Sequence, residues 1–212
     1  MNNGASTAGA TGAKAQNASW PDGYGRQVFD SVDSTLSEAA RQASELTGST
    51  WILAQEQTAA RGRRGRSWAT PRGNFAATLM MRRSESPSTA ALRSFVASLA
   101  LRRAFVATTR DEGALTLKWP NDVLLNGGKV AGILLESIGD FLAIGIGVNL
   151  AHAPGADQVE AGALRPVSVV AETGKVVPPE VFLDALAAEY AQLETQFQTY
   201  GFAPIRTAWL SH

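Results

Sequence analysis

The sequence predicts an α+β domain built on a mixed, mostly antiparallel sheet that is packed with helices. Segments with the apolar pattern of strands follow one another in runs, which is typical of this class when the helices are segregated from the sheet. The turn signal Asn126-Gly127-Gly128 joins two such segments as a β-hairpin. The chain has 212 residues and no internal repeat, so one domain accounts for its length. We expect the helices to lie on one side of the sheet.

The N-terminal part predicts a tail followed by the first structured segments. Residues 1–19 are mostly Ala, Gly, Asn, Ser and Thr, so they can bury little and are expected to be disordered, which leaves 20–212 as the domain. From Thr35 apolar residues recur at helical spacing, Thr35 and Glu38 form a capping box, and Gly48 follows the helix. Apolar runs on either side predict an edge strand at Val28-Phe29 and a buried strand at 51–54.

The remaining elements follow from apolar periodicity and turn signals. Further strands are predicted at 74–81, 115–118, 123–125, 129–136 and 141–150. In the last of these, Gly145 and Gly147 imply that another group packs closely against the backbone. A second helix has the core stripe Leu92, Phe95, Val96 and Leu99. Pro178-Pro179 opens a third helix with Phe182, Leu186, Tyr190, Leu193 and Phe197, and a short final helix ends at Trp209-Leu210.

The composition excludes several kinds of protein. There is no cysteine, which excludes disulfides, thiolate metal sites and a cysteine nucleophile. His152 and His212 are too few for a histidine-based zinc site. The formal net charge is zero, so no overall field attracts nucleic acid or membrane. No apolar run approaches the roughly 18 residues of a membrane span, and the first residues show no signal-peptide pattern. We expect a soluble, cytoplasmic protein that binds neither nucleic acid nor membrane.

The basic loop, residues 61–72, contains five arginines and no acidic residue. A solvated loop or a nucleic-acid patch is the commonest explanation for such a run, but the remainder of the chain is net acidic and offers no second basic face. Arginine suits bidentate contacts to phosphate or carboxylate, and glycines let backbone N–H groups approach a ligand. Trp68 could stack on a flat ring. The five arginines are Arg61, Arg63, Arg64, Arg66 and Arg72.

A second unusual segment is Lys118-Trp119-Pro120-Asn121-Asp122, which places an ammonium at a strand end beside a rigid turn. A lysine at a strand end often only extends its ammonium group into solvent and has no functional role. Held at a fixed point, however, it can bridge a carboxylate and a phosphate, which otherwise repel each other. Asp122 could instead contact a magnesium-bound water. At four further polar positions a helix cap or other local hydrogen bonding is the simpler interpretation: Ser34, Thr35, Gln57 and Asn149.

Five motifs occur in a fixed order: Asp33-Ser34-Thr35, the run from Gln57 to Trp68, the Lys118–Asp122 segment, the run from Lys129 to Glu136, and Gly145-Ile146-Gly147-Val148-Asn149. Together they closely resemble the biotin protein ligase family, over about residues 24–209. The resemblance implies a class II synthetase-like catalytic domain. Such a domain uses ATP and Mg²⁺ to convert biotin into biotinyl-5′-AMP, and then transfers biotin to a lysine of a biotin carboxyl carrier domain.

The resemblance also implies roles for individual residues, although the metal ligands stay open. The catalytic residues would be Lys118, Arg61 and Arg63. The biotin-binding residues would be Ser34, Thr35, Gln57, Arg61, Gly62, Arg63, Lys118 and Gly132. The nucleotide-binding residues would be Arg63, Arg64, Trp68, Lys118 and Asn149.

The chain also departs from the family pattern. Leu36 stands where the family usually has asparagine, and Ala60 replaces the usual glycine before Arg61. We expect neither the N-terminal helix-turn-helix of the repressor members nor the C-terminal SH3-like barrel, since the chain ends at His212. Two alternatives stay open: a related lipoate ligase or transferase, and a truncated biotin-binding remnant with little ligase turnover. A homodimer is a further open alternative.

Overall fold

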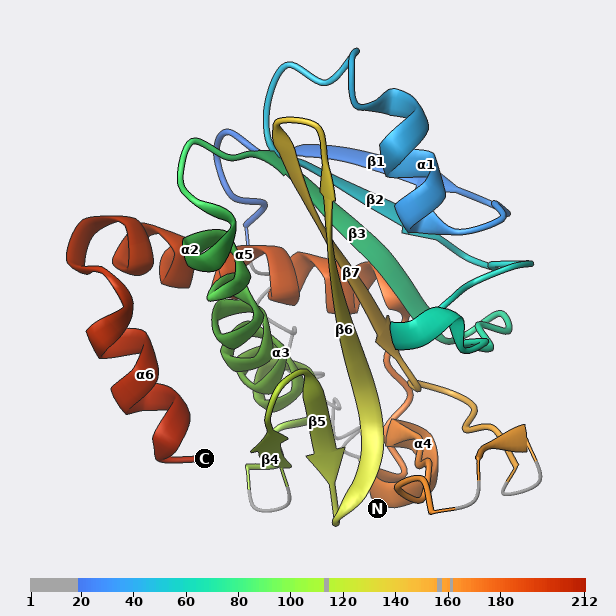
Figure 1. Cartoon of the computed structure of the whole chain (residues 1–212). Coiled ribbons are helices and arrows are strands. Elements are labelled where there is room, and N and C mark those ends of the chain that lie inside the picture. The colour runs from blue at the N-terminus through green and yellow to red at the C-terminus, as the bar shows by residue number, and fades with distance from the viewer. Residues whose placement is uncertain (1–18, 113–114, 156–157, 161) are drawn as a thin grey trace, which may run out of the picture.

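The computed structural model describes residues 19–112, 115–155, 158–160 and 162–212, so the tail expected over 1–19 lies almost wholly outside the described residues. Its frame is a seven-stranded sheet with the order β1-β2-β3-β7-β6-β5-β4 (Figure 1). β1 and β2 are parallel and the other pairs are antiparallel, which confirms the predicted mixed sheet. The strands are β1 (Gly25–Phe29), β2 (Thr50–Ala54), β3 (Phe75–Arg82), β4 (Leu115–Lys118), β5 (Asp122–Leu125), β6 (Gly128–Ile138) and β7 (Phe141–Val148).

Tight turns fix the register of the strands that follow β4. Asn126 and Gly127 separate Leu125 from its partner Gly128, and their φ angles are 49° and 73°. Asparagine and glycine reach this left-handed conformation at low cost, as a two-residue hairpin turn requires. The predicted hairpin is therefore confirmed.

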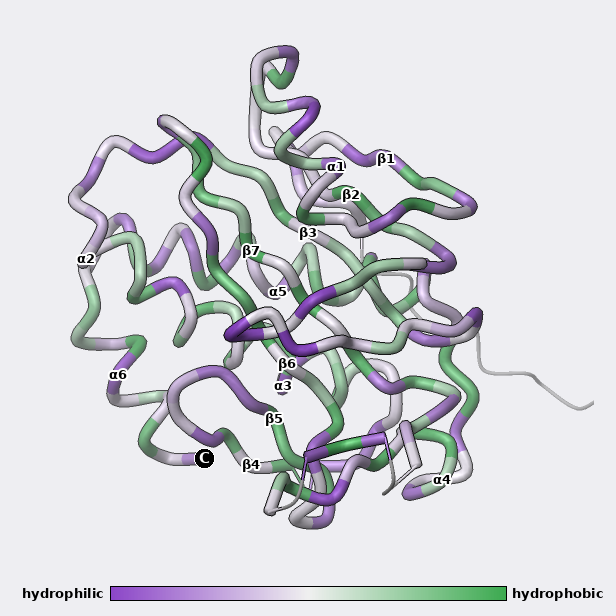
Figure 2. Tube along the Cα trace, turned by 45° about the vertical axis from the view of Figure 1, so that its right-hand side comes forward, coloured by the Kyte–Doolittle hydropathy of each residue, from purple (hydrophilic) through white to green (hydrophobic). Residues whose placement is uncertain are grey.

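The larger core lies between the sheet and two long helices, α3 (Arg93–Thr109) and α5 (Pro179–Tyr200) (Figure 1). Trp51 of β2 and Tyr190 of α5 meet edge to face, with ring centroids 5.9 Å apart. Hydrophobic residues concentrate along these inner segments, whereas many of the connecting loops are hydrophilic (Figure 2). Among the described residues, no helix is both long and apolar enough to span a bilayer.

The remaining helices on the C-terminal side are shorter. α6 (Phe202–Leu210) follows α5 and is tied to α3, because the Trp209 indole N–H donates to Ser98 Oγ at 2.9 Å. The final helix predicted from the sequence is thus confirmed. Two short helices were not predicted: α2 (Pro87–Ala91) and α4 (Val169–Thr173).

Helix α1 (Thr35–Gln42) lies on the opposite face of the sheet, so the expectation that all helices share one side is wrong. Its Leu36 packs with Ile52 in a second, smaller core cluster. Neighbouring strand residues point to opposite faces, and Trp51 accordingly belongs to the larger core. The helix also ends before the stop expected near Gly48.

The start of α1 differs from the predicted capping box. Ser34 is the N-cap, and its Oγ accepts a hydrogen bond from Ser37 N at 3.0 Å. Thr35 is already helical, so the third helical position is Ser37. The Glu38 carboxylate accepts hydrogen bonds from Arg41 instead of reaching back to the helix start.

Candidate active site

A cavity of about 680 Å³ opens on the face of the sheet that carries α1. Its walls come from the start of α1, the basic loop, residues on or next to β4, β5, β6 and β7, and residues of the segment between β7 and α4. Arg64 is not in the wall: it lies near the tip of the basic loop with a φ of 59°. The other residues proposed from the sequence all line this one cavity: Ser34, Thr35, Gln57, Arg61, Gly62, Arg63, Trp68, Lys118, Gly132 and Asn149.

Two glycines of β7 form the floor. A Cβ atom on Gly145 would lie 2.8 Å from Leu36 Cδ1, and one on Gly147 would lie 2.4 Å from Trp68 Nε1. Both distances are shorter than side-chain contacts tolerate. The close packing expected from these glycines is therefore confirmed, and its partners are Leu36 and Trp68. The indole ring also lies against Gly132 of β6, where a Cβ would meet it at an ordinary 3.5 Å.

Gln57 organises one polar wall of the cavity. Its Oε1 accepts hydrogen bonds from the backbone N–H of Thr35 at 2.8 Å and from Thr35 Oγ1 at 3.2 Å. Its Nε2 donates to Thr70 Oγ1 at 3.0 Å, and Thr78 Oγ1 donates to Thr35 Oγ1 at 2.8 Å. These bonds join α1, β3 and the basic loop. They leave one N–H of the Gln57 carboxamide without an acceptor among the described residues, so this N–H is available to a ligand.

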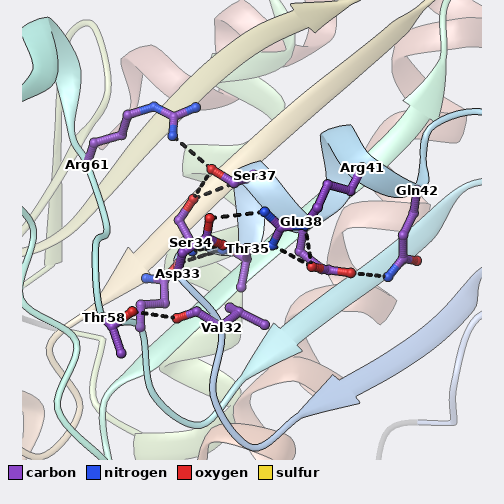
Figure 3. A network of polar contacts seen from close by, with 11 residues as sticks. Val32, Asp33, Ser34, Thr35, Ser37, Glu38, Arg41, Gln42, Thr58 and Arg61 are labelled. Atoms are coloured by element: carbon purple, nitrogen blue, oxygen red, sulfur yellow. Dashed lines mark hydrogen bonds and ion pairs between the residues drawn. The ribbon is translucent and has the colours of Figure 1, made fainter.

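Ser34 stands beside this wall and is almost fully buried. Its hydroxyl donates to Ser37 Oγ at 2.9 Å and accepts from Ser37 N, as Figure 3 shows. The backbone N–H of Ser34 donates to Asp33 Oδ1 at 2.7 Å. Hydrogen bonds from Arg41 and from this N–H lower the pKa of Asp33 to about 2. A fixed carboxylate therefore holds the turn that presents Ser34.

The basic loop folds back on itself. Arg61 pairs with Ser67 as an isolated bridge, and the Gly62 N–H donates to the Arg66 carbonyl at 2.7 Å. The arginine side chains spread in different directions. Arg63 donates to Asn121 Oδ1 at 3.3 Å, Arg66 pairs with Glu160 at 3.0 Å, and Arg61 pairs with Glu136 at 2.9 Å.

Two lysines line the cavity, and the sequence interpretation assigned a role to only one. Lys118 is exposed at the end of β4 and has no salt bridge within the described part of the chain. Lys129 of β6 is held more firmly: its Nζ lies 2.8 Å from Asp122 Oδ1 and 5.5 Å from the centroid of the Trp68 ring. The signal in the sequence was a lysine directly after a hairpin turn, three residues before Gly132.

Asn149 is buried, and its carboxamide Nδ2 donates to the Val167 carbonyl at 3.0 Å. Its backbone N–H donates to Val130 O at 2.8 Å. Asn149 thus fastens the segment after β7 to β6 and to the start of α4. This is the local role that the sequence left open, and the residue also lines the cavity.

Comparisons with known proteins agree with this geometry. Residues 28–150 match the model of the Biotin/lipoate A/B protein ligase family. The chain is 57% identical over 185 residues to the biotin–[acetyl-CoA-carboxylase] ligase of Paracoccus denitrificans, covering 85% of this chain and 77% of that protein.

Solved structures resemble the fold as well. The biotin protein ligase of Leishmania major in complex with biotin aligns with a TM-score of 0.75 and 27% identity, over 90% of this chain and 81% of the other. The same enzyme in complex with biotinyl-5-AMP aligns with a TM-score of 0.68 and 29% identity, over 82% and 76%. The resemblance inferred from the motifs is confirmed: this chain belongs to the Biotin/lipoate A/B protein ligase family.

Proposed function

We propose that the protein is a biotin–[acetyl-CoA-carboxylase] ligase, which activates biotin with ATP to biotinyl-5′-AMP and transfers biotin to a lysine of a biotin carboxyl carrier domain. The Paracoccus relative carries this name, and the Leishmania enzyme is described with biotin and with biotinyl-5-AMP. The observation that carries the proposal is that one cavity joins a neutral polar wall to a cationic wall.

The neutral wall suits a ring with a urea-like edge. The hydroxyl of Ser34 donates its hydrogen bond to Ser37 Oγ, so toward the cavity it can act only as an acceptor. Gln57 keeps one amide N–H. An acceptor beside a donor complements a cyclic urea, which offers N–H donors and a carbonyl acceptor. We therefore assign Ser34, Thr35 and Gln57 to the biotin ring, with Gly132 and Leu36 along its apolar part.

The cationic wall suits the chemistry of activation. A biotin carboxylate oxygen attacks the α-phosphorus of ATP, the bond from that phosphorus to the bridging oxygen breaks, and pyrophosphate leaves. Both reactants are anionic, so fixed cations lower the barrier most where charge develops. We assign this work to Lys118, Lys129 and Arg63. We further assign Trp68 to the adenine side, with Arg64 and Asn149 next to the nucleotide.

Magnesium fits this site as a partner of the nucleotide. Among the described residues, no group of three or more His, Asp or Glu side chains could hold a metal ion. Mg²⁺ commonly binds through one or two carboxylates, substrate phosphates and water. Asp122 lines the cavity, and while its Oδ1 pairs with Lys129, its other carboxylate oxygen would supply such a contact. The ion would neutralise phosphate charge during activation.

In the second step the neutral amine of the carrier lysine attacks the acyl carbon of biotinyl-5′-AMP. The bond from that carbon to the AMP oxygen breaks, AMP leaves, and the amine loses a proton to form the amide. The mixed anhydride is sensitive to water, so a loop that encloses it protects the intermediate. We assign that task to the basic loop.

The decisive test has two parts. The first measures whether biotin or lipoate drives ATP–pyrophosphate exchange. The second measures the mass of a carboxyl carrier domain after incubation with the protein, biotin and ATP. We expect biotin-dependent exchange and a mass increase equal to one biotinyl group on the carrier. Exchange with lipoate but not with biotin would favour the lipoate ligase alternative. Biotin binding without exchange would favour the remnant without turnover.

A further inference from the structure

A salt bridge holds Arg61 at the base of the basic loop, and its partner Glu136 lies outside the cavity wall that Arg61 lines. Its Nε and Nη2 donate to the two carboxylate oxygens of Glu136, at 3.3 and 2.9 Å. Its remaining terminal nitrogen, Nη1, donates to Ser37 Oγ at 3.1 Å (Figure 3). All three guanidinium nitrogens are therefore engaged, in the paired geometry that makes arginine–carboxylate contacts specific.

The two partners of Arg61 belong to different elements. Ser37 lies in the first turn of α1, and Glu136 lies on β6. Arg61 consequently spans α1 and the sheet at the rim of the cavity. Its own backbone pairs with Ser67, so an anchored Arg61 also anchors the returning strand of the loop, directly before Trp68.

The same contacts reach the ligand wall. Ser37 Oγ accepts from Arg61, which is an obligate donor, and it also accepts from the Ser34 hydroxyl. This arrangement orients the Ser34 proton away from the cavity and presents its acceptor to the ligand. Arg61 therefore contacts the partner of Ser34 through Ser37, while its ion pair with Glu136 holds the basic loop to the sheet.

We propose that Glu136 and Ser37 are positioning residues that clasp Arg61, and that Arg61 acts through this clasp and not by contacting phosphate. The proposal rests on the proposed function. In the reaction, the clasp keeps the basic loop over biotinyl-5′-AMP. Arg63 and Arg64, farther along the loop, are left to meet the nucleotide.

The test compares Glu136→Gln with a matched control, Glu189→Gln. The Glu136 and Arg61 side chains are 31% and 39% exposed. The Glu189 and Arg103 side chains, which pair between α5 and α3 on the helical face of the sheet, are 26% and 41% exposed. The readout is AMP formed per biotin transferred to the carrier, because this ratio rises when the intermediate escapes and does not change when less protein is folded. We expect about a fivefold rise for Glu136→Gln, which corresponds to about 1 kcal/mol for a partly exposed pair, and none for Glu189→Gln.

A double-mutant cycle separates the clasp from direct catalysis. If Arg61 acts through Glu136, then the double variant Arg61→Gln, Glu136→Gln should form as much AMP per biotin transferred as either single variant. Ser37→Ala should raise the same ratio by a smaller factor. Unchanged ratios in Glu136→Gln, or fully additive effects in the double variant, would overturn the proposal.

A ligand-free measurement keeps the clasp distinct from the proposed function. Limited trypsin digestion should cleave within the basic loop faster in Glu136→Gln than in the wild type or in Glu189→Gln, and none of these changes adds or removes an arginine. If the wild type forms no adenylate yet cleavage accelerates, the function is wrong and the clasp stands. Equal cleavage in all three proteins counts against the clasp itself.

Discussion

At the scale of single residues, Gly145 and Gly147 decide which side chains reach the floor of the cavity. Both lie on the same face of β7, and each accommodates one side chain from a distant segment. Leu36, which replaces the family's usual asparagine, is one of these side chains, so its role is to pack against the backbone of Gly145. The sequence predicted that something would pack there, but its identity depended on how α1 and the basic loop meet the sheet.

Replacing each glycine with alanine should affect a different ligand, because the two glycines lie under different parts of the cavity. Gly147→Ala displaces a rigid indole, so we expect about a tenfold higher KM for ATP, with stabilisation by biotin retained. Gly145→Ala meets the flexible end of Leu36, so the effect should be smaller and should fall on biotin binding. Calorimetry with biotin and initial rates against ATP distinguish the two. Equal losses in both measurements for both variants would contradict this division.

The lysines offer a second test at this scale. Lys129 is fixed by Asp122 and Trp68, whereas Lys118 is exposed to water, which screens its charge. We expect Lys129→Ala to slow adenylate formation by about 10²–10³-fold, as for other fixed groups that stabilise developing charge, and Lys118→Ala to slow it less. Single-turnover rates measure both. A larger loss for Lys118→Ala would make Lys118 the main cation of the activation step, as the motif implies.

At the scale of elements, local signals predicted the strands and hairpins well, because alternation and turn chemistry depend on neighbouring residues. The sequence also contained signals for the short helices that were missed. Ser86 followed by Pro87 starts α2, and Ser168 caps α4. The face on which α1 packs depends on contacts between distant segments, so periodicity alone could not place it.

The start of α1 should show a pH dependence that comes from Asp33. Its pKa is lowered from 3.8 to about 2 by Arg41 and the Ser34 N–H, so its stabilising effect is present above pH 3.8 and is lost as the pH falls through about 2. The side chain is 46% exposed, so screening limits the effect to about 1 kcal/mol. Urea unfolding between pH 5 and 2 should show the difference between wild type and Asp33→Asn shrinking toward zero. A constant difference would show that Asp33 does not act through its charge.

At the scale of the whole molecule, the cavity stands on one face of the sheet and the main core on the other. The motifs predicted the contents of the cavity, because their residue types match phosphate and amide chemistry. They could not predict that Lys129 would be more firmly held than Lys118, since that depends on how β5 and β6 pair. They also did not predict the buried charges of the helical face, where Arg93 of α3 meets Glu194 of α5 and Glu85.

This buried cluster should be the most sensitive polar position for stability. The side chains of Arg93 and Glu194 are only 5% and 4% exposed, and Glu194 accepts three hydrogen bonds from Arg93. Glu194→Gln leaves a buried guanidinium short of its main partner, so we expect the free energy of unfolding to fall by about 3 kcal/mol. Glu189→Gln, on the same helix but in a partly exposed pair, should cost less than about 1 kcal/mol. Urea unfolding measures both.

A double replacement tests the physical reason for that loss. Arg93→Met combined with Glu194→Leu removes both buried charges and provides apolar contacts with Phe197. In the wild type, Arg93 Cζ lies 5.1 Å from the centroid of the Phe197 ring. Buried ion pairs replaced by apolar groups are often neutral or stabilising, so the double variant should recover most of the stability lost in Glu194→Gln. Because the helical face is remote from the cavity, stabilisation by biotin should be the same in all of these variants. If the double variant is as unstable as Glu194→Gln, then the cluster contributes through packing and not through paired charge.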